Sequence, residues 1–362
     1  MREDAGYWIA WSRITGIGAA RVRRLWEHFG DLRAAWNAPA EALHRAGLDR
    51  RVAAAAVAER PALNPGAERD ALERTGVDLI TFADSSYPVL LRRGDGGPAC
   101  LHVCGSLIPE DEMAIAVVGS RAISSYGRQV TLQFVSDLAR QGLTIVSGLA
   151  RGIDAVAHRA TLETGARTIA VLGCGVDVAY PPEHRGLAAD IAAHGAVVSE
   201  FPLGTKPDAP NFPMRNNIIA GLSLGTLVIE AGTSSGALIT AARALDWNRE
   251  VFAVPGSIYA PRSQGTNRLI SLGHAKSVST VDEIMAELNL GLVPQQLAMD
   301  GLLAHDRTEG TLLAHLGQEP LHVDALTRLT ALPVSVVTST LTMLELRGLV
   351  RQVSAMQFVR AR

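Results

Sequence analysis

The chain has 362 residues, of which 48% are hydrophobic and 19% charged, so its composition excludes an intrinsically disordered protein and predicts more than one domain. The formal net charge of −2 gives no overall basic field, so any nucleic-acid binding must come from local patches. The longest uncharged apolar run, residues 216–229, is too short and too polar for a bilayer span, and the start of the chain lacks the features of a signal peptide. We therefore expect a cytoplasmic protein without a membrane segment.

Residues 1–65 are predicted to form a small helical domain of the helix-hairpin-helix or SAM-like type. Apolar patterns of helical period lie at residues 7–12, 18–29 and 32–36, and an alanine-rich stretch continues to residue 57. The Gly16-Ile17-Gly18 turn is similar to turns that bring backbone amides close to a DNA phosphate. A tight turn between two helices of an interaction module explains the same glycines, and we weigh the two interpretations equally.

Residues 66–111 are predicted to be a linker with short strands that lead into the core. The stretch 61–66 and the irregular stretch 88–98 are rich in proline and glycine, whereas residues 100–104 alternate as a strand does. Cys100 and Cys104 have no second ligand pair at metal-binding spacing, and Cys174 lies alone on a glycine loop. We therefore expect no metal site and no disulfide framework.

Residues 112–290 alternate short apolar runs with helical patterns, and they are the most informative part of the chain. The apolar runs lie at residues 114–118, 143–146, 168–172, 196–198, 226–229 and 250–254. Each run is short and mostly β-branched or leucine, which indicates buried parallel strands, and stretches such as residues 129–139 follow the helical period. The pattern predicts an α/β fold with a Rossmann-like, doubly wound parallel sheet.

Residues 291–307 are predicted to be a linker, and residues 308–362 a winged helix. Two helices are expected at residues 321–329 and 334–346, followed by a hairpin over residues 348–359. Six basic and six acidic residues from Asp300 onward cancel, and the second helix carries serine and threonine rather than arginine. We therefore favour protein contact or regulation over reading of a DNA groove for this domain.

The turns that follow the predicted strands are built from glycine and small hydroxyl residues. Ligands of a doubly wound sheet bind beyond the carboxyl ends of its strands. Here these ends lead into Gly119-Ser120-Arg121, Ser147-Gly148, Gly173-Cys174-Gly175 and the stretch 230–236. Neither a P-loop nor a G-x-G-x-x-G motif is present, but several anion sites in a row suit a single nucleic-acid strand. For any one loop, close packing of a helix on a strand explains the glycines equally well.

A second cluster lies in residues 211–223, at the start of a predicted helix. Arg215 there can hold a phosphate, and Phe212 and Asn216 can stack on or hydrogen-bond to a base. The alternative is an ordinary capped helix whose Arg215 pairs with Glu200 or Glu230.

Little in the sequence indicates catalysis. Ser147, Asp154 and His158 suggest a triad, but Asp154 and His158 lie four residues apart on one predicted helix and no G-x-S-x-G turn surrounds Ser147. A surface pair of Asp154 with His158 is the simpler interpretation. Glu200 and Glu230 follow strands at the glycine-rich edge, which keeps open a carboxylate-assisted reaction on a nucleotide sugar.

An ordered series of motifs runs from about residue 112 to residue 280. It comprises Val118-Gly119-Ser120-Arg121 with Ser125-Tyr126-Gly127, the glycine loop 147–154 with His158, residues 172–177 with Tyr180-Pro181, Asn211-Phe212-Pro213 with Arg215-Asn216, residues 235–240, and residues 251–256. In this order the motifs resemble the DprA (Smf) family of DNA-processing proteins of bacterial transformation. The flanking helical and winged-helix domains are similar to accessory domains of that family.

The resemblance implies a recombination mediator without catalytic turnover or a cofactor. Such a protein binds single-stranded DNA through its Rossmann-like domain, forms a homodimer through that domain, and helps to load the RecA recombinase. The DNA-binding positions that carry over are Gly119, Ser120, Arg121, Ser147, Gly148, Gly173, Gly175, Phe212, Arg215 and Asn216.

The sequence departs from the family pattern at one point. A basic residue often follows the Tyr-Pro pair in the family, whereas Pro182 stands there in this chain, so we expect His184 or Arg185 to supply that charge. The resemblance places the dimer surface around Leu269 and Ile270.

The second hypothesis is an enzyme on the same scaffold. Nucleoside-5′-monophosphate phosphoribohydrolases also pair an arginine-bearing helix with a glycine turn, in the pattern P-G-G-x-G-T-L-x-E. Here Ile239 and Thr240 stand where the acidic pair would fall, so glycosidic cleavage would lack its carboxylate and binding is favoured. A pure protein adaptor is the third hypothesis.

Overall fold

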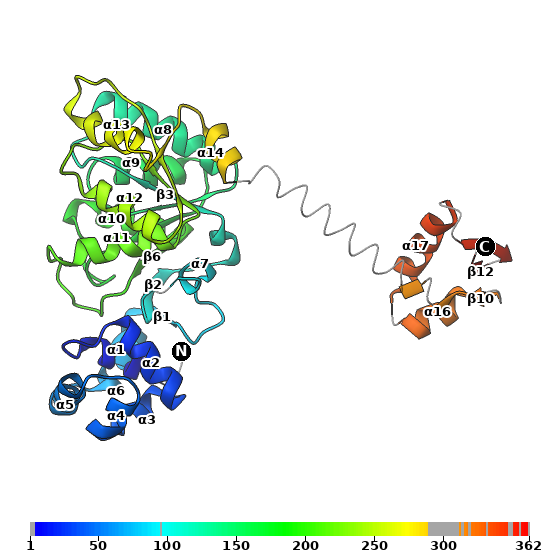
Figure 1. Cartoon of the computed structure of the whole chain (residues 1–362), viewed down its shortest axis with the longest axis horizontal. Coiled ribbons are helices and arrows are strands. Elements are labelled where there is room, and N and C mark those ends of the chain that lie inside the picture. The colour runs from blue at the N-terminus through cyan, green and yellow to red at the C-terminus, as the bar shows by residue number, and fades with distance from the viewer. Residues whose placement is uncertain are drawn as a thin grey trace. The chain divides into compact units, whose positions relative to one another are not determined.

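The structure of the protein is a computed structural model that describes residues 4–94, 96–288, 311–312, 315–317, 320–330, 332–346, 350–354 and 356–360. The chain forms two compact units, Met1–Ile284 and Met285–Arg362. In the first unit, a group of N-terminal helices adjoins a large α/β fold built around one β-sheet (Figure 1). No helix among the described residues is both long enough and apolar enough to cross a membrane.

The first unit begins with short helices that pack around tryptophan side chains. These helices are α1 (Ala5–Arg13), α2 (Ala19–Phe29), α3 (Leu32–Asn37), α4 (Ala40–Arg45) and α5 (Arg50–Glu59). Trp8 and Trp11 are fully buried, and the Trp11 ring meets the Trp36 ring edge to face with 5.2 Å between centroids. The helices predicted in this region are confirmed, because their apolar faces meet in one core.

The Gly16-Ile17-Gly18 turn joins α1 to α2. Gly16 has a φ of +79°, a left-handed conformation that favours glycine, and Ile17 is buried. The neighbouring cation, Arg21, donates to the Gly16 carbonyl and pairs with Asp49. Since Arg21 is engaged within the helical region, this geometry favours the interpretation as a tight helix-helix turn.

Residues 61–66, which we expect from the sequence to be a linker, are mostly helical. The 3₁₀ helix η1 spans Arg60–Ala62, and α6 spans Pro65–Thr75. The Asn64 side chain accepts hydrogen bonds from two backbone N–H groups in the first turn of α6, and Pro65 stands at its first position. α6 packs on α1 through Leu72 and Ile9. Proline here starts a helix instead of interrupting one.

In the described part of the chain, nine strands form one sheet after α6. They are β1 (Asp78–Thr81), β2 (Cys100–Gly105), β3 (Ala114–Val118), β4 (Thr144–Ser147), β5 (Thr168–Val171), β6 (Ala196–Ser199), β7 (Gly225–Val228), β8 (Glu250–Ala253) and β9 (Lys276–Ser277). Their order is β1-β2-β6-β5-β4-β3-β7-β8-β9, in which only the pairs β1–β2 and β2–β6 are antiparallel. The predicted Rossmann-like fold is confirmed, and the predicted strands correspond to β2 through β8.

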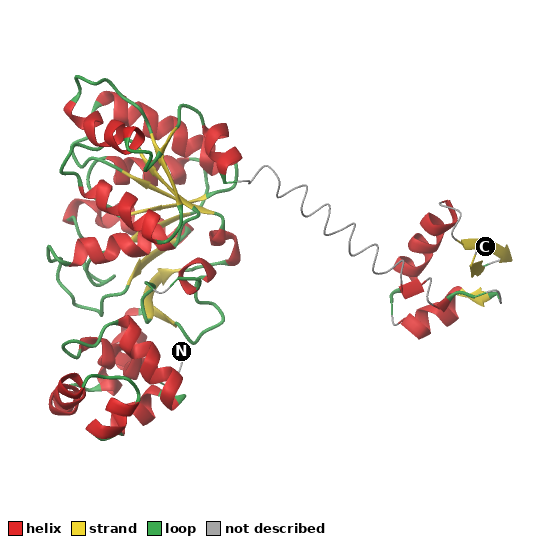
Figure 2. Cartoon of the chain, in the orientation of Figure 1, coloured by secondary structure: helices red, strands yellow, loops and turns green. Residues whose placement is uncertain are grey.

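Helices cover both faces of this sheet (Figure 2). They are α7 (Val89–Arg92), α8 (Ser125–Arg140), α9 (Ile153–Glu163), α10 (Arg185–His194), α11 (Asn211–Gly221), α12 (Gly236–Asp246), α13 (Gln264–Ser271) and α14 (Val281–Glu287), with 3₁₀ turns η2 (Pro109–Glu112), η3 (Pro182–His184) and η4 (Pro261–Ser263). On β5, Ile169 shares a core with Ile218 of α11, whereas the next residue, Ala170, shares a core with Ile191 of α10. This alternation places α11 and α10 on opposite faces of the sheet.

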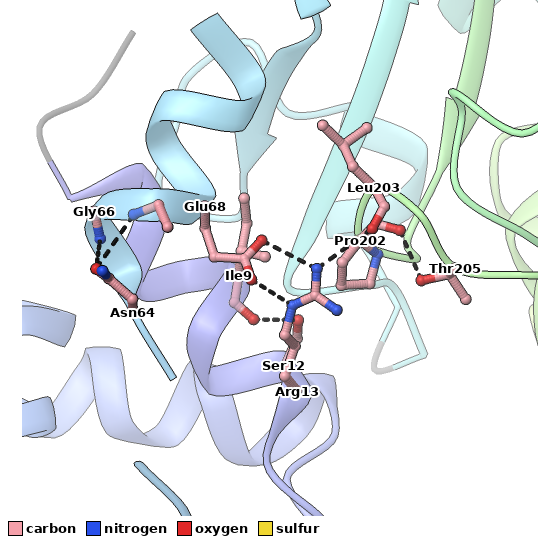
Figure 3. Close-up of polar contacts among 10 residues, drawn as sticks. Ile9, Ser12, Arg13, Asn64, Gly66, Glu68, Pro202, Leu203 and Thr205 are labelled. Carbon is pink, nitrogen blue, oxygen red and sulfur yellow. Dashed lines mark hydrogen bonds and ion pairs between the residues drawn. The ribbon is translucent and has the colours of Figure 1, made fainter. Parts of the chain in front are cut away.

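Arg13 of α1 connects the N-terminal helices to the sheet (Figure 3). Its Nε lies 2.6 Å from Oε1 of Glu68 in α6, and its Nη2 donates to the Leu203 carbonyl at 3.4 Å. Leu203 belongs to the loop between β6 and α11, and the Asp177 carboxylate accepts from the next amide of this loop, that of Gly204. The loop that leads into α11 is therefore held from two sides.

Arg23 of α2 makes a second connection between the N-terminal helices and the sheet. Its side chain is buried, its Nη2 donates to the Gly97 carbonyl, and its guanidinium lies 4.1 Å from the centroid of the Phe82 ring. The segments around Phe82 and Gly97 flank β1 and β2, so the helices and the antiparallel edge of the sheet pack as one body.

The second unit is a small α/β domain. It contains β10 (Leu321–His322), α16 (Val323–Thr330), α17 (Val334–Leu346), β11 (Val350–Ser354) and β12 (Gln357–Arg360), and its strands pair in the order β10-β12-β11. Leu326 of α16, Leu341 of α17 and Phe358 of β12 share its core. The predicted winged helix is confirmed, while the predicted linker 291–307 lies outside the described residues.

Candidate functional site

The chain changes direction between β3 and β7. α8 leads from β3 to β4 on one side, whereas β7, on the other side of β3, is reached through α11 on the opposite face. Diverging connections leave a crevice outside the carboxyl ends of the two strands, where doubly wound sheets bind their ligands. The position of the crevice therefore follows from the topology of the sheet.

A cavity of about 590 Å³ lies at this point. Its walls are the β3 turn with Ser120 and Arg121, the start of α11 with Phe212 and Arg215, and the turn into α12. A second, smaller cavity adjoins it at the ends of β4 and β5, and Arg121, Phe212 and Arg215 line both. We call these two cavities together the binding track.

Two aromatic rings and a guanidinium group meet in the binding track. The Phe212 ring packs on Tyr180 with 5.6 Å between centroids, and the exposed Arg121 places its guanidinium carbon 5.7 Å from the Phe212 centroid. A cation at this distance is attracted to the ring face. Aromatic faces for bases, next to cations for phosphates, form the usual platform for a single nucleic-acid strand.

Arg215 lies beneath the binding track and is only 5% exposed. Its Nη1 donates to the carbonyls of Gly148 and Val171, which joins the ends of β4 and β5. Burial lowers the pKa of Arg215 to about 10, an effect that nearby Asp154 opposes. The alternative in which Arg215 pairs with Glu200 or Glu230 is wrong, because α11 directs this side chain at two carbonyls instead.

A Cβ would be crowded by neighbouring atoms at four predicted glycines of the site: Gly119, Gly148, Gly173 and Gly175. A Cβ on Gly148 would come within 2.3 Å of the Arg215 guanidinium, and a Cβ on Gly173 within 3.0 Å of the Phe212 ring. Close packing therefore accounts for these glycines. They contribute to the binding track by letting Arg215 and Phe212 lie directly on the strand ends.

Most of the predicted DNA-binding residues come together in the binding track: Gly119, Ser120, Arg121, Gly148, Gly173, Phe212, Arg215 and Asn216. Asn216 is 9% exposed, and its side-chain amide donates to the Gly236 carbonyl at 3.4 Å. It thereby joins α11 to the start of α12.

Four predicted residues do not line the binding track, and two of them require correction. The Ser147 hydroxyl is buried and donates to the Val117 carbonyl at 2.7 Å, so this side chain cannot reach a ligand. His184 is also buried, with Nδ1 2.9 Å from the Leu149 carbonyl, so it does not present the charge expected after the Tyr-Pro pair. Gly175 and Arg185 lie outside the lining as well.

The interpretation of Asp154 and His158 as a surface pair is also wrong. Both side chains are buried on the side of α9 that packs on the sheet. The Asp154 carboxylate accepts from the Gly148 and Ala150 amides, and His158 Nδ1 lies 2.7 Å from Thr168 Oγ1. Burial lowers the pKa of His158 to about 3, so its ring is neutral at physiological pH.

Neither of the two glutamates considered for catalysis, Glu200 and Glu230, lines the binding track. Glu230 is 3% exposed and accepts hydrogen bonds from the backbone N–H and the hydroxyl of Ser124, so it anchors the start of α8. Glu200 follows β6 and does not line the binding track.

Glu200 gives the protein a testable pH dependence. Burial raises the pKa of its carboxyl from an ordinary 4.5 to about 7, so between these values the folded chain binds a proton that the unfolded chain releases. The contribution of Glu200 to stability therefore decreases as pH rises through this window, by at most about 1.4 kcal/mol per pH unit. We expect Glu200→Gln to lose less free energy of unfolding than the wild type between about pH 5 and pH 7 in urea titrations. Parallel pH profiles of the two proteins would contradict the assignment.

The structure adds residues to the binding track that sequence reasoning did not assign. Arg151, Tyr180, Arg262 and the turn from Ser234 to Gly236 all line it. Arg151 and Tyr180 stand inside motifs that the sequence shows, but nothing in those motifs tells which side chains face outward. Arg262 follows β8 in a turn without a local signal.

The residues expected at the dimer surface lie on α13. Leu269 and Ile270 are partly buried against the sheet core, and the nearby Leu272 is 54% exposed. β9, which follows α13, is one of the two edge strands of the sheet. The homodimer stays a prediction.

The comparisons with known proteins agree with this architecture. The family model of DNA recombination-mediator protein A matches residues 78–289, and the model of the DprA winged helix domain matches residues 294–356. Protein Smf of Synechocystis is 35% identical over 397 residues, which cover 99% of both chains. Protein Smf of Escherichia coli is 43% identical over 285 residues, which cover 76% of both chains.

Solved structures point the same way. DNA processing protein A of Streptococcus pneumoniae matches with a TM-score of 0.69 and 34% identity, covering 78% of this chain and 97% of its own. DNA processing protein A of Helicobacter pylori, whose structure concerns its single-stranded DNA binding mode, matches with a TM-score of 0.53 and 26% identity over 59% of this chain and 97% of its own. With these matches over the sheet and the winged helix, the chain belongs to the DNA recombination-mediator protein A (DprA/Smf) family.

Proposed function

We propose that this protein binds single-stranded DNA along the binding track and helps to load the RecA recombinase onto that strand. The observation that carries the proposal is the joint position of Arg121, Phe212 and Tyr180 at the carboxyl ends of the strands. The family membership of the chain and the DNA-binding mode described for the Helicobacter relative support it.

In this proposal the residues of the binding track have different tasks. Arg121, which is exposed, contacts phosphate, whereas Phe212 and Tyr180 offer their ring faces to bases. Arg215 acts from below by holding the Gly148 turn and the end of β5 in place. Asn216 fixes the adjoining wall at α12.

We further propose that the protein binds DNA without catalytic turnover or a cofactor, as a homodimer through α13 and β9. The domain limits that go with this function are residues 1–65, 66–111, 112–290, 291–307 and 308–362.

The phosphoribohydrolase hypothesis is tested by assaying release of free base from nucleoside monophosphates. If the wild type releases base and Arg121→Ala does not, the site is catalytic and the binding proposal is overturned.

Arg121→Ala is expected to weaken binding of oligothymidylate about fivefold at 0.1 M salt and to reduce the salt slope by about 0.7, the values for one lost phosphate contact on a single strand. The measurement is a salt titration of fluorescence anisotropy, with duplex DNA alongside.

The matched control for this variant is Arg140→Ala. Arg140 is also exposed, but it ends α8, a helix of 16 residues and thus about 24 Å long, at the opposite edge of the sheet. Equal affinity of wild type and Arg121→Ala for oligothymidylate would contradict the proposed site.

A further inference from the structure

Arg151 and Glu183 form an ion pair on the rim of the smaller cavity. Arg151 follows the Gly148 turn after β4, and Glu183 stands in η3, directly after the Tyr180-Pro181 pair. The Arg151 Nε donates to Glu183 Oε1 at 2.5 Å, while the two side chains are 66% and 46% exposed. The pair therefore bridges two loops at the surface.

Arg151 faces the same cavity as the residues proposed to hold DNA. It lines this cavity together with Arg121, Tyr180 and Phe212. Because Arg151 lines the same cavity as the two rings, a strand whose bases stack on them can bring a phosphate to this second guanidinium group. Guanidinium binds phosphate in the same forked geometry in which it binds carboxylate. Glu183 thus occupies a place that suits a phosphate.

We propose that Arg151 is a further phosphate-binding residue and that Glu183 competes with the DNA strand for it. This inference rests on the proposed function and adds a restraint on affinity to it. Exposed ion pairs contribute little to stability, so a phosphate can displace Glu183 at small cost. After the exchange the Glu183 carboxylate lies unpaired near the strand, which lowers the affinity below what the binding track would otherwise give and promotes release.

The test uses four full-length proteins: wild type, Arg151→Ala, Glu183→Gln and the double variant. Their binding to oligothymidylate is measured by fluorescence anisotropy over a salt titration. We expect Arg151→Ala to weaken binding about fivefold at 0.1 M salt and to reduce the salt slope by about 0.7. We expect Glu183→Gln to strengthen binding about 1.4- to fivefold, the range that an exposed ion pair supplies.

The direction of the coupling separates competition from simple repulsion. If Glu183 competes for Arg151, Glu183→Gln gains more affinity in the wild-type background than in the Arg151→Ala background, where no pair has to be broken. If Arg151 only screens Glu183 and never leaves it, the gain is larger in the Arg151→Ala background, because the unpaired carboxylate there repels the strand fully. Measuring the cycle at 0.15 M salt, where charges are screened over about 8 Å, reduces effects from afar.

The control pair is Arg140 with Asp137 on α8. Its side chains are 66% and 45% exposed, which matches the tested pair, but it lies at the far end of α8. Arg140→Ala and Asp137→Asn are expected to leave the affinity unchanged. Equal changes in both pairs would overturn the inference, because they would report net charge alone.

The outcomes also distinguish this inference from the proposed function. Binding that Arg121→Ala weakens but Arg151→Ala leaves unchanged would overturn the role of Arg151 and keep the proposed function. A coupling of the opposite sign would overturn the competition. Failure of the wild type to bind single-stranded DNA would overturn both the proposed function and this inference.

Discussion

Arg215→Ala is expected to lower the free energy of unfolding by about 3–5 kcal/mol, the size of effect seen when one partner of a buried charged network is removed. The variant leaves the Gly148 and Val171 carbonyls without their donor. It also removes the positive charge that opposes the raised pKa of buried Asp154.

Urea unfolding of the full chain measures this loss, and Arg121→Ala is its internal reference. Arg121 is exposed, and a surface substitution of this kind changes stability by less than about 0.5 kcal/mol. We expect DNA binding to fall in both variants but stability to fall in Arg215→Ala alone. Equal stability of the two variants would mean that Arg215 does not hold the strand ends together.

Phe212→Ala is expected to weaken binding of oligothymidylate about 5- to 150-fold, because stacking of one base on an aromatic ring contributes about 1–3 kcal/mol. The effect is not ionic, so the slope of affinity against salt should stay as in the wild type. This combination differs from that expected for Arg121→Ala, in which a moderate loss of affinity comes with a shallower slope. Salt titrations of the two variants side by side therefore separate stacking from phosphate contact.

Phe212→Tyr and Phe212→Leu sharpen this experiment. Tyrosine keeps the ring face and should bind nearly as well as phenylalanine, whereas leucine keeps apolar volume but offers no face to a base. Recovery of affinity by leucine would show that Phe212 acts by packing on Gly173 and Tyr180 rather than by stacking on DNA.

Much of the fold could be predicted from the sequence because the central strands are covered on both faces. Most of their residues are then buried and apolar, so β3 through β8 stand out as short apolar runs. The outer strands lack this constraint. Both residues of β9 are exposed and β1 is only partly buried, so neither gives such a run.

The site could be predicted as a region but not side chain by side chain. The carboxyl ends of parallel strands converge, so any set of turns after the strands indicates the same edge. Whether a side chain at that edge faces outward depends on packing between distant segments. Arg215 meets Gly148 across 67 positions of the sequence, and Arg151 meets Glu183 across 32. No local spacing encodes such contacts, which is why the sequence gives no sign of the Gly148 and Val171 carbonyls as partners of Arg215 and does not assign Arg151.

The docking of the N-terminal helices has a consequence for how this chain gains and loses structure. The tryptophan core around Trp8 and Trp11 includes Cys100 of β2, and Arg23 reaches past that core to the Gly97 carbonyl. Unfolding of the helices would therefore expose the β1–β2 edge of the sheet to solvent. Unfolding of that edge would in turn remove packing contacts from the helices. We therefore expect the helices and the sheet to unfold together on heating or during proteolysis, although the sequence predicts them as separate domains.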